Sequence, residues 1–220
     1  LGNLCQDFTV NTGLKQAILS RGNARQNDAL ITAKMQSIMA THPELLGCYV
    51  FCQNGKQYKI QRRTGHIDSY REKPWYIAAR VTPDTNMFFP ADLLELYDDS
   101  TVAFTFQRGL TDANTGAFLG DILLTIDGTY LDGIFPLRTD IQPDALMVTD
   151  SSLRILYHSD PAFNNKLIVS SQFFTALSQN TQNYFVYRTG GKEIAVFYSV
   201  STPNRFRVVE LMPMNSFFRP

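Results

Sequence analysis

Residues 46–63 read LGCYVFCQ-NG-KQYKIQRR, and this stretch decides the fold class. The side-chain pattern on both sides of Asn54-Gly55 has a period of two, which is typical of β-strands. An Asn-Gly pair between two such runs predicts a hairpin with a type I′ turn, because both central positions of that turn need positive φ. We therefore expect an antiparallel sheet to begin at residue 46.

The segment before this hairpin has a helical pattern. Its apolar positions recur at helical spacing and form one stripe, at Leu14, Ile18, Ala24, Ile31, Met35 and Ile38. The pattern predicts a single long helix over residues 1–42, which His42-Pro43 would end because proline does not continue a helix. A helix of this length is the expected contact of a homodimer.

Short strands interrupted by short helices follow the hairpin. We expect strands at 102–108, 118–127, 145–149, 154–158, 183–188, 192–200 and 206–212, and helices at 75–80, 130–135 and 171–179. Strands of this kind on mostly antiparallel sheets predict an α+β fold. The order of elements repeats once, so we expect two lobes, 43–142 and 143–220, behind the N-terminal helix.

Charge and cysteine content exclude several classes of protein. The chain has 20 acidic and 20 basic residues, whereas a nucleic-acid partner requires a surplus of Lys and Arg. No apolar run approaches the ~20 residues of a membrane span. Cys48 and Cys52 lie on one face of a predicted strand, ~13 Å apart, which is too far for a disulfide. With Cys5 they match no zinc spacing, so we expect free thiols and no metal or cofactor.

Residues 71–76, Arg71-Glu72-Lys73-Pro74-Trp75-Tyr76, hold the only tryptophan. Pro74 fixes its own φ and favours an extended Lys73, so the backbone bends rigidly here and Trp75 and Tyr76 project from it in a defined direction. Two interpretations follow. Rigid aromatics beside cations can bind a small anionic or zwitterionic ligand, or the aromatics can fill the core edge while the charges stay in water.

The order of elements resembles the double Cache family, the extracytoplasmic sensor modules of bacterial transmembrane receptors. Residues 73–76 match the family's Arg-Pro-Trp-Tyr with lysine in place of arginine, and 119–127 resemble its Asp-ended strand. Residues 104–108 and 131–135 look most like sensor histidine kinases. The resemblance covers nearly the whole chain and implies a membrane-distal and a membrane-proximal PAS-like lobe.

The resemblance also implies a ligand site in the distal lobe. Lys73 would hold a ligand carboxylate, Trp75 and Tyr76 would contact the ligand, and Asp127 would take its ammonium. An ammonium lacks the planar two-point grip of a guanidinium, so Arg71 would support Lys73, and Phe89 is a nearby aromatic candidate. Asp127 can alternatively cap a following helix. Arg108, on a strand among aromatics, can contact the ligand or form a structural ion pair.

These features predict an extracytoplasmic ligand-sensing region of a cell-membrane receptor, whose membrane segments lie outside this sequence. The ligand would be an amino acid, amine, organic acid or saccharide, and the output a histidine kinase. A diguanylate cyclase or chemoreceptor output is the alternative. The chain has no nucleophile elbow, phosphate loop or zinc-protease motif, so we expect no catalysis. A hydrolase with dispersed catalytic residues and a non-binding interaction domain remain the other classes.

Overall fold

A computed structural model describes residues 12–19, 24–63, 69–83, 87–90, 103–112, 114–130, 145–150, 152–163, 166, 168, 171–179, 183–200 and 206–215. The chain divides into two compact units: residues 1–100 and 105–127 belong to the first, and residues 101–104 and 128–220 belong to the second. The lobe boundary expected between residues 142 and 143 lies outside the described residues. Each unit is built on one five-stranded antiparallel sheet, which confirms the predicted α+β class.

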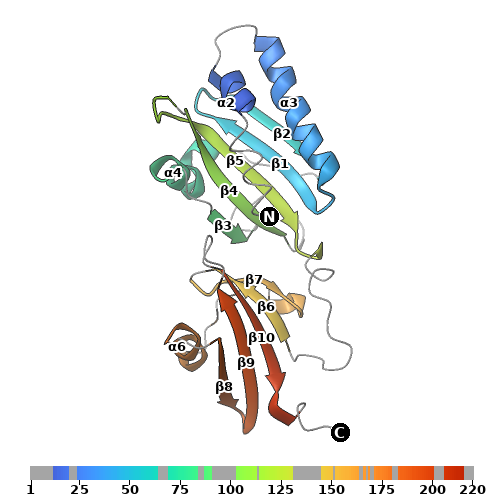
Figure 1. Cartoon of the computed structure of the whole chain (residues 1–220), viewed down its shortest axis with the longest axis vertical. Helices are drawn as coiled ribbons and strands as arrows, with labels where there is room; N and C mark the ends of the chain where they lie inside the picture. The colour runs from blue at the N-terminus through green and yellow to red at the C-terminus, as the bar shows by residue number, and fades with distance from the viewer. Residues whose placement is uncertain are drawn as a thin grey trace. The chain divides into compact units, whose positions relative to one another are not determined.

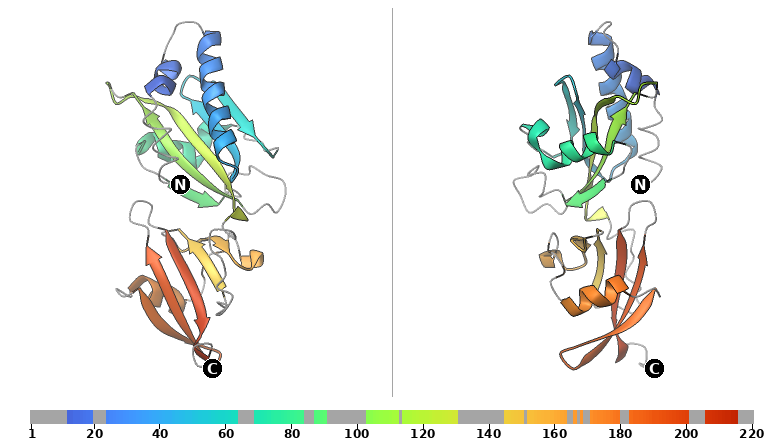
Figure 2. Two further views of the ribbon diagram at one scale, coloured as in Figure 1. Left: turned by 45° about the vertical axis from the view of Figure 1, so that its right-hand side comes forward. Right: turned by 90° about the vertical axis from the view of Figure 1, so that its left-hand side faces the viewer.

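The first unit contains α2 (Thr12–Leu19), α3 (Ala24–Thr41), β1 (Leu45–Cys52), β2 (Gln57–Gln61), the 3₁₀ turn η1 (Tyr70–Glu72), α4 (Pro74–Val81), β3 (Met87–Pro90), β4 (Ala103–Thr111) and β5 (Phe118–Asp127). Its strand order is β2-β1-β5-β4-β3. Helices α3 and α4 cover opposite faces of this sheet (Figure 2). All eight residues of β1 are buried, because side chains on both of its faces meet a helical layer.

The predicted hairpin of β1 and β2 is present, but its turn differs from the expected type. Cys52 N donates to Lys56 O at 2.9 Å, which closes a three-residue loop over 53–55. Only Gly55 has positive φ, at 96°, so type I′ was wrong. The Asn54 side chain accepts a hydrogen bond from Lys56 N at 3.0 Å, which fixes the loop without a left-handed Asn.

The N-terminal segment contains two helices in the part of the chain that is described. Helix α3 ends at Thr41, as His42-Pro43 predicted. Helices α2 and α3 contact each other (Figure 1). A continuous helix does not bring residues on either side of 20–23 together in this way, because each residue advances the chain by 1.5 Å. The single helix expected over residues 1–42 is therefore not confirmed.

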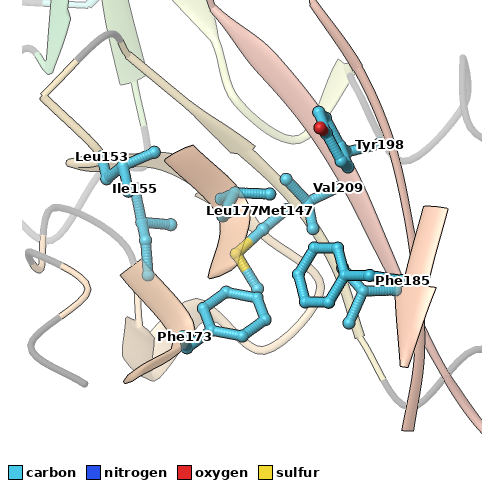
Figure 3. Close-up of a cluster of buried hydrophobic side chains, with 9 residues drawn as sticks. Met147, Leu153, Ile155, Phe173, Leu177, Phe185, Tyr198 and Val209 are labelled. Carbon is cyan, nitrogen blue, oxygen red and sulfur yellow. The ribbon is translucent and has the colours of Figure 1, made fainter. Parts of the chain in front are cut away.

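The second unit repeats the topology of the first. It contains β6 (Ala145–Thr149), β7 (Ile155–His158), the 3₁₀ turn η3 (Pro161–Phe163), α6 (Ser171–Gln179), β8 (Tyr184–Thr189), β9 (Lys192–Val200) and β10 (Arg207–Pro213). Its strand order is β7-β6-β10-β9-β8, so both sheets follow the order 2-1-5-4-3 within their own unit. Phe173 and Leu177 of α6 pack on Met147, Phe185 and Val209 of the sheet (Figure 3).

Two thiols lie inside the first unit. Cys48 and Cys52 are buried and free, as expected, while Cys5 lies outside the described residues. Burial raises the pKa of the Cys48 thiol and raises that of Cys52 to about 11. Both thiols therefore stay protonated and unreactive at neutral pH. None of the helices in the described ranges is long and apolar enough to cross a membrane.

Candidate functional site

Helix α4 directs the aromatic pair of the 71–76 segment into the first unit. Lys73 is extended, with φ −71° and ψ 136°, as the following proline requires. Its carbonyl accepts hydrogen bonds from Tyr76 N at 3.0 Å and Ile77 N at 3.1 Å. Pro74 occupies the first helical position, where its missing N–H costs nothing. Trp75 and Tyr76 are consequently buried, whereas Ile77 is about half exposed.

The pair joins an aromatic cluster on the α4 face of the sheet. Its members are Tyr49, Phe51, Tyr70, Trp75, Tyr76 and Leu123, with Phe118 packed against them. The Phe51 and Trp75 ring centroids are 5.5 Å apart, and Tyr70 meets Tyr76 edge-on at 5.0 Å. Such geometry stabilises aromatic pairs beyond their buried area. The aromatics therefore fill the core of this unit and also form one wall of the site described next.

A buried polar pair lies against this wall. Gln107 of β4 donates its Nε2 to the Trp75 carbonyl oxygen at 2.9 Å and to Oδ2 of Asp121 on β5. Both side chains are completely buried. Burial raises the pKa of Asp121 well above its ordinary value, although hydrogen bonds from Gln107 and the Ile122 amide act in the opposite direction. The folded chain therefore favours the protonated carboxyl.

Four buried polar atoms at this place lack a hydrogen-bond partner among the described residues: Trp75 Nε1, Thr105 Oγ1, Gln107 Oε1 and Asp121 Oδ1. Thr105 and Gln107 are two residues apart on β4, so they share the face that meets α4. An unpaired buried polar atom costs about 1–3 kcal/mol, and buried polar atoms in folded proteins are nearly always paired. Unpaired buried polar atoms of this kind mark a place that a water molecule or a ligand can complete.

The atoms of this cluster complement a zwitterion. Once the Asp121 carboxyl is ionised, its Oδ1 is an acceptor, as are Gln107 Oε1 and the Thr105 hydroxyl, and these acceptors suit the three N–H donors of an ammonium group. Trp75 Nε1 is a donor only and suits a carboxylate. No group of three His, Cys, Asp or Glu side chains in the described ranges is arranged to hold a metal ion. The arrangement of donors and acceptors is therefore complementary to a small amine or amino acid.

The sequence-predicted cations lie at the edge of this site or beyond it. Arg71 is exposed, and its Nη2 donates to Gln53 O in the hairpin loop at 2.8 Å. Lys73 is partly buried at the start of α4. Arg108 directly follows Gln107 in β4, so its side chain lies on the opposite face of the sheet from Trp75. The structure does not bring Arg108 to the aromatic wall.

Asp127 lies away from the described cluster. Asp127 ends β5, six residues beyond Asp121, which is about 20 Å along a strand. Its amide donates to Glu44 O at 2.8 Å. Phe89 belongs to β3, and its side chain lies outside the description. The carboxylate beside Trp75 is that of Asp121. In the sequence, Asp121 is the one charged residue within the apolar run 118–126.

No family model matches the chain, and no curated protein matches it. Its fold is similar to that of solved sensory domains. The ligand-binding domain of the Campylobacter jejuni chemoreceptor Tlp3, in complex with 4-methylisoleucine, superposes with a TM-score of 0.61 at 14% identity, over 99% of this chain and 82% of that one. The corresponding domain of the Pseudomonas fluorescens chemoreceptor CtaA, in complex with L-alanine, gives 0.61 at 15%, over 99% and 90%.

A third similar structure is the extracellular domain of mmHK1S-Z2, which is named as a histidine kinase. It gives a TM-score of 0.66 at 12% identity, over 94% of this chain and 87% of that one. At these identities the likeness establishes a shared fold. The chain thus has the two-sheet, PAS-like α+β architecture of extracellular sensory domains.

Proposed function

We propose that this chain is the extracytoplasmic sensory region of a membrane receptor and that it binds a small amino acid on the α4 face of the first sheet. The observation that carries the proposal is the cluster of four unpaired buried polar atoms behind the Trp75–Tyr76 wall. Asp121 would pair with the ligand ammonium, and Trp75 Nε1 and Lys73 would meet its carboxylate. Tlp3 and CtaA, which share the fold, are both solved with amino-acid ligands.

Ligand binding would act on the charge of Asp121. An ammonium next to a buried carboxyl favours the ionised form, because the pair offsets the loss of hydration. Gln107 links that carboxyl to the Trp75 carbonyl, so the change reaches the first turn of α4 directly. A ligand shifts the receptor only by its different affinity for the two states. In the receptor this shift would pass through the second unit to a histidine kinase, with a chemoreceptor as the alternative output.

Thermal unfolding with a panel of amino acids tests the proposal. A ligand at about 100 times its Kd stabilises the folded state by about 2.7 kcal/mol, which raises the Tm by several degrees. Two derivatives of the best ligand serve as controls: the N-acetyl form lacks the ammonium, and the amide form lacks the carboxylate. Both derivatives should fail to bind. A panel in which no amino acid raises the Tm would overturn the proposal and favour a non-binding domain.

Substitution of Trp75 by phenylalanine should weaken amino-acid binding about tenfold. Phenylalanine keeps an aromatic ring beside Phe51 but removes the Nε1 donor, and one hydrogen bond to a charged group is worth about 1.5 kcal/mol or more. Isothermal titration calorimetry measures the change, with Asp127→Asn as the comparison variant. Asp127→Asn should leave the affinity unchanged. A loss in Asp127→Asn with none in Trp75→Phe would place the ligand at the other end of β5.

A further inference from the structure

The second unit contains a cavity of about 890 Å³. This volume lies within the range of sites that hold ligands larger than an amino acid. Its floor includes Met147, Ile155 and Phe173, which are buried members of the hydrophobic core of that unit (Figure 3). Its rim includes the exposed residues Phe163 and Lys166. The cavity is therefore apolar at depth and polar at its mouth.

Backbone hydrogen bonds fix the rim next to the edge strand β7. Ile155 N donates to Lys166 O at 2.8 Å, and Ile168 N donates to Leu153 O at 3.2 Å. The chain around Lys166 consequently pairs with the outer side of this sheet edge. Phe163 N donates to Asp160 O at 3.1 Å, which closes the η3 turn. These bonds place Lys166 and Phe163 at the mouth in one defined arrangement.

The charges at the mouth favour an anion. The Lys166 ammonium lies 5.3 Å from the centroid of the Phe163 ring, and no carboxylate within the described ranges pairs with it. Arg154 adds a second cation to the lining. The one lining carboxylate, Asp160, already accepts a hydrogen bond from Ala162 N at 3.0 Å. Lys166 is thus the exposed cation at the mouth, and the lining carboxylate of Asp160 is engaged in its own turn.

His158 adds a polar group between the mouth and the floor. Its Nδ1 lies 2.9 Å from the amide nitrogen of Asp160 and 3.1 Å from the carbonyl oxygen. This nitrogen is occupied within the turn, which leaves Nε2 as the ring atom that can meet a ligand. Burial lowers the pKa of His158, so the ring is neutral at neutral pH. The cation that selects the ligand charge is therefore Lys166.

We propose that the second unit binds an amphiphilic carboxylate, an organic acid whose charged head meets Lys166 at the mouth and whose apolar body lies on the Ile155–Phe173 floor. The apolar floor supplies affinity in proportion to the area it buries. The cation supplies the preference for acids, since a charge-assisted hydrogen bond is about twice as strong as a neutral one. This site is separate from the proposed amino-acid site and does not depend on it.

Octanoate is the probe, titrated into the 220-residue chain by calorimetry below its micellar concentration. We expect saturable one-to-one binding, with octan-1-ol and octylammonium at least tenfold weaker. Lys166→Gln should weaken octanoate binding about tenfold, because it removes the charge and keeps a polar side chain that can donate a hydrogen bond. Lys59→Gln is the matched control: Lys59 is an exposed lysine of β2 in the first unit and is absent from the cavity lining, so its substitution should leave octanoate binding unchanged.

A second pair of variants tests the cavity itself. Thr189 is an exposed lining residue on β8, so Thr189→Trp should fill the mouth and abolish octanoate binding. Arg188→Trp places the same ring on the other face of β8 and should not weaken it. Asp121→Asn in the first unit should also leave octanoate binding unchanged. No saturable binding, equal binding of octan-1-ol, or equal losses in the two tryptophan variants would overturn the proposal.

Discussion

Asp121→Asn should abolish amino-acid binding and stabilise the free protein in the same variant. Asparagine keeps the shape of the carboxyl but cannot ionise, so a ligand ammonium would be buried without its counter-charge. Removing one partner of a buried ion pair costs about 3–5 kcal/mol, which corresponds to a loss of affinity of more than 100-fold. Calorimetry with the best ligand of the amino-acid panel measures this loss.

The stability gain of Asp121→Asn follows from the raised pKa of Asp121. An acid whose pKa is raised by folding contributes its full stability below its unfolded value, near 3.8, and loses it as the pH rises through the folded value. Asparagine does not titrate, so the variant does not show this pH-dependent decrease in the free energy of unfolding. Its free energy of unfolding should therefore exceed that of the native chain by an amount that grows with pH above about 4. Urea unfolding between pH 4 and pH 8 measures the difference.

Asp112 provides the control for this pH dependence. Its carboxylate is exposed, and a hydrogen bond from the Asn114 amide lowers its pKa. Asp112→Asn should therefore show no stability gain that grows with pH, because this group favours the ionised form in the fold. If Asp121→Asn and Asp112→Asn gave the same pH profile, the buried protonated carboxyl at position 121 would be ruled out.

Gly120→Ala should destabilise the first unit by about 3 kcal/mol, which lowers the Tm by roughly 6–12 °C. Gly120 lies opposite Cys52 in the β1–β5 ladder. A Cβ at this position would lie 2.4 Å from Phe51 O and 3.0 Å from Cys52 Cα. Both are backbone atoms, and the adjacent hydrogen bond from Gln53 N to Leu119 O, at 2.8 Å, leaves the two strands no room to separate.

Gly116→Ala separates this steric effect from an effect of backbone conformation. Gly116 has φ of 69° and open space around its Cα. Alanine there should cost about 1 kcal/mol, which is the usual penalty for a left-handed residue with a side chain. Thermal unfolding of the two variants should thus show a clearly larger loss for Gly120→Ala. Equal losses would mean that the close approach of β5 to Phe51 does not limit the packing of this sheet.

Local sequence patterns predicted most of the secondary structure. Helix α6 has the predicted bounds, 171–179, and β5 has the predicted bounds, 118–127, because their apolar spacing is regular and turn residues flank them. β3 was missed because it is a four-residue edge strand that ends in proline. The contact between α2 and α3 was not predicted, because an apolar stripe in the sequence does not tell one continuous helix from two helices that pack together.

The candidate site was predicted only in part. Trp75 and Tyr76 stood out because a single tryptophan after proline is a strong local signal. Asp121 could not be identified as a site residue in this way, since β5 has two aspartates. Only the pairing of β5 with β1 and β4 decides which of the two lies beside α4. Thr105 and Gln107 are ordinary strand residues in the sequence. Their importance comes from the face of β4 on which they lie, which meets α4 and its aromatic side chains, and only the folded sheet defines this face.

The buried thiols of β1 make this chain its own reporter of local opening. The second unit has no cysteine, so alkylation of Cys48 and Cys52 monitors the first unit alone. A thiol that is buried and protonated reacts only while its sheet is open, so the labelling rate reports the free energy of that opening. Mass spectrometry of labelled Cys48 should show protection by an amino acid and none by octanoate. Equal protection by both would mean that the two units open together.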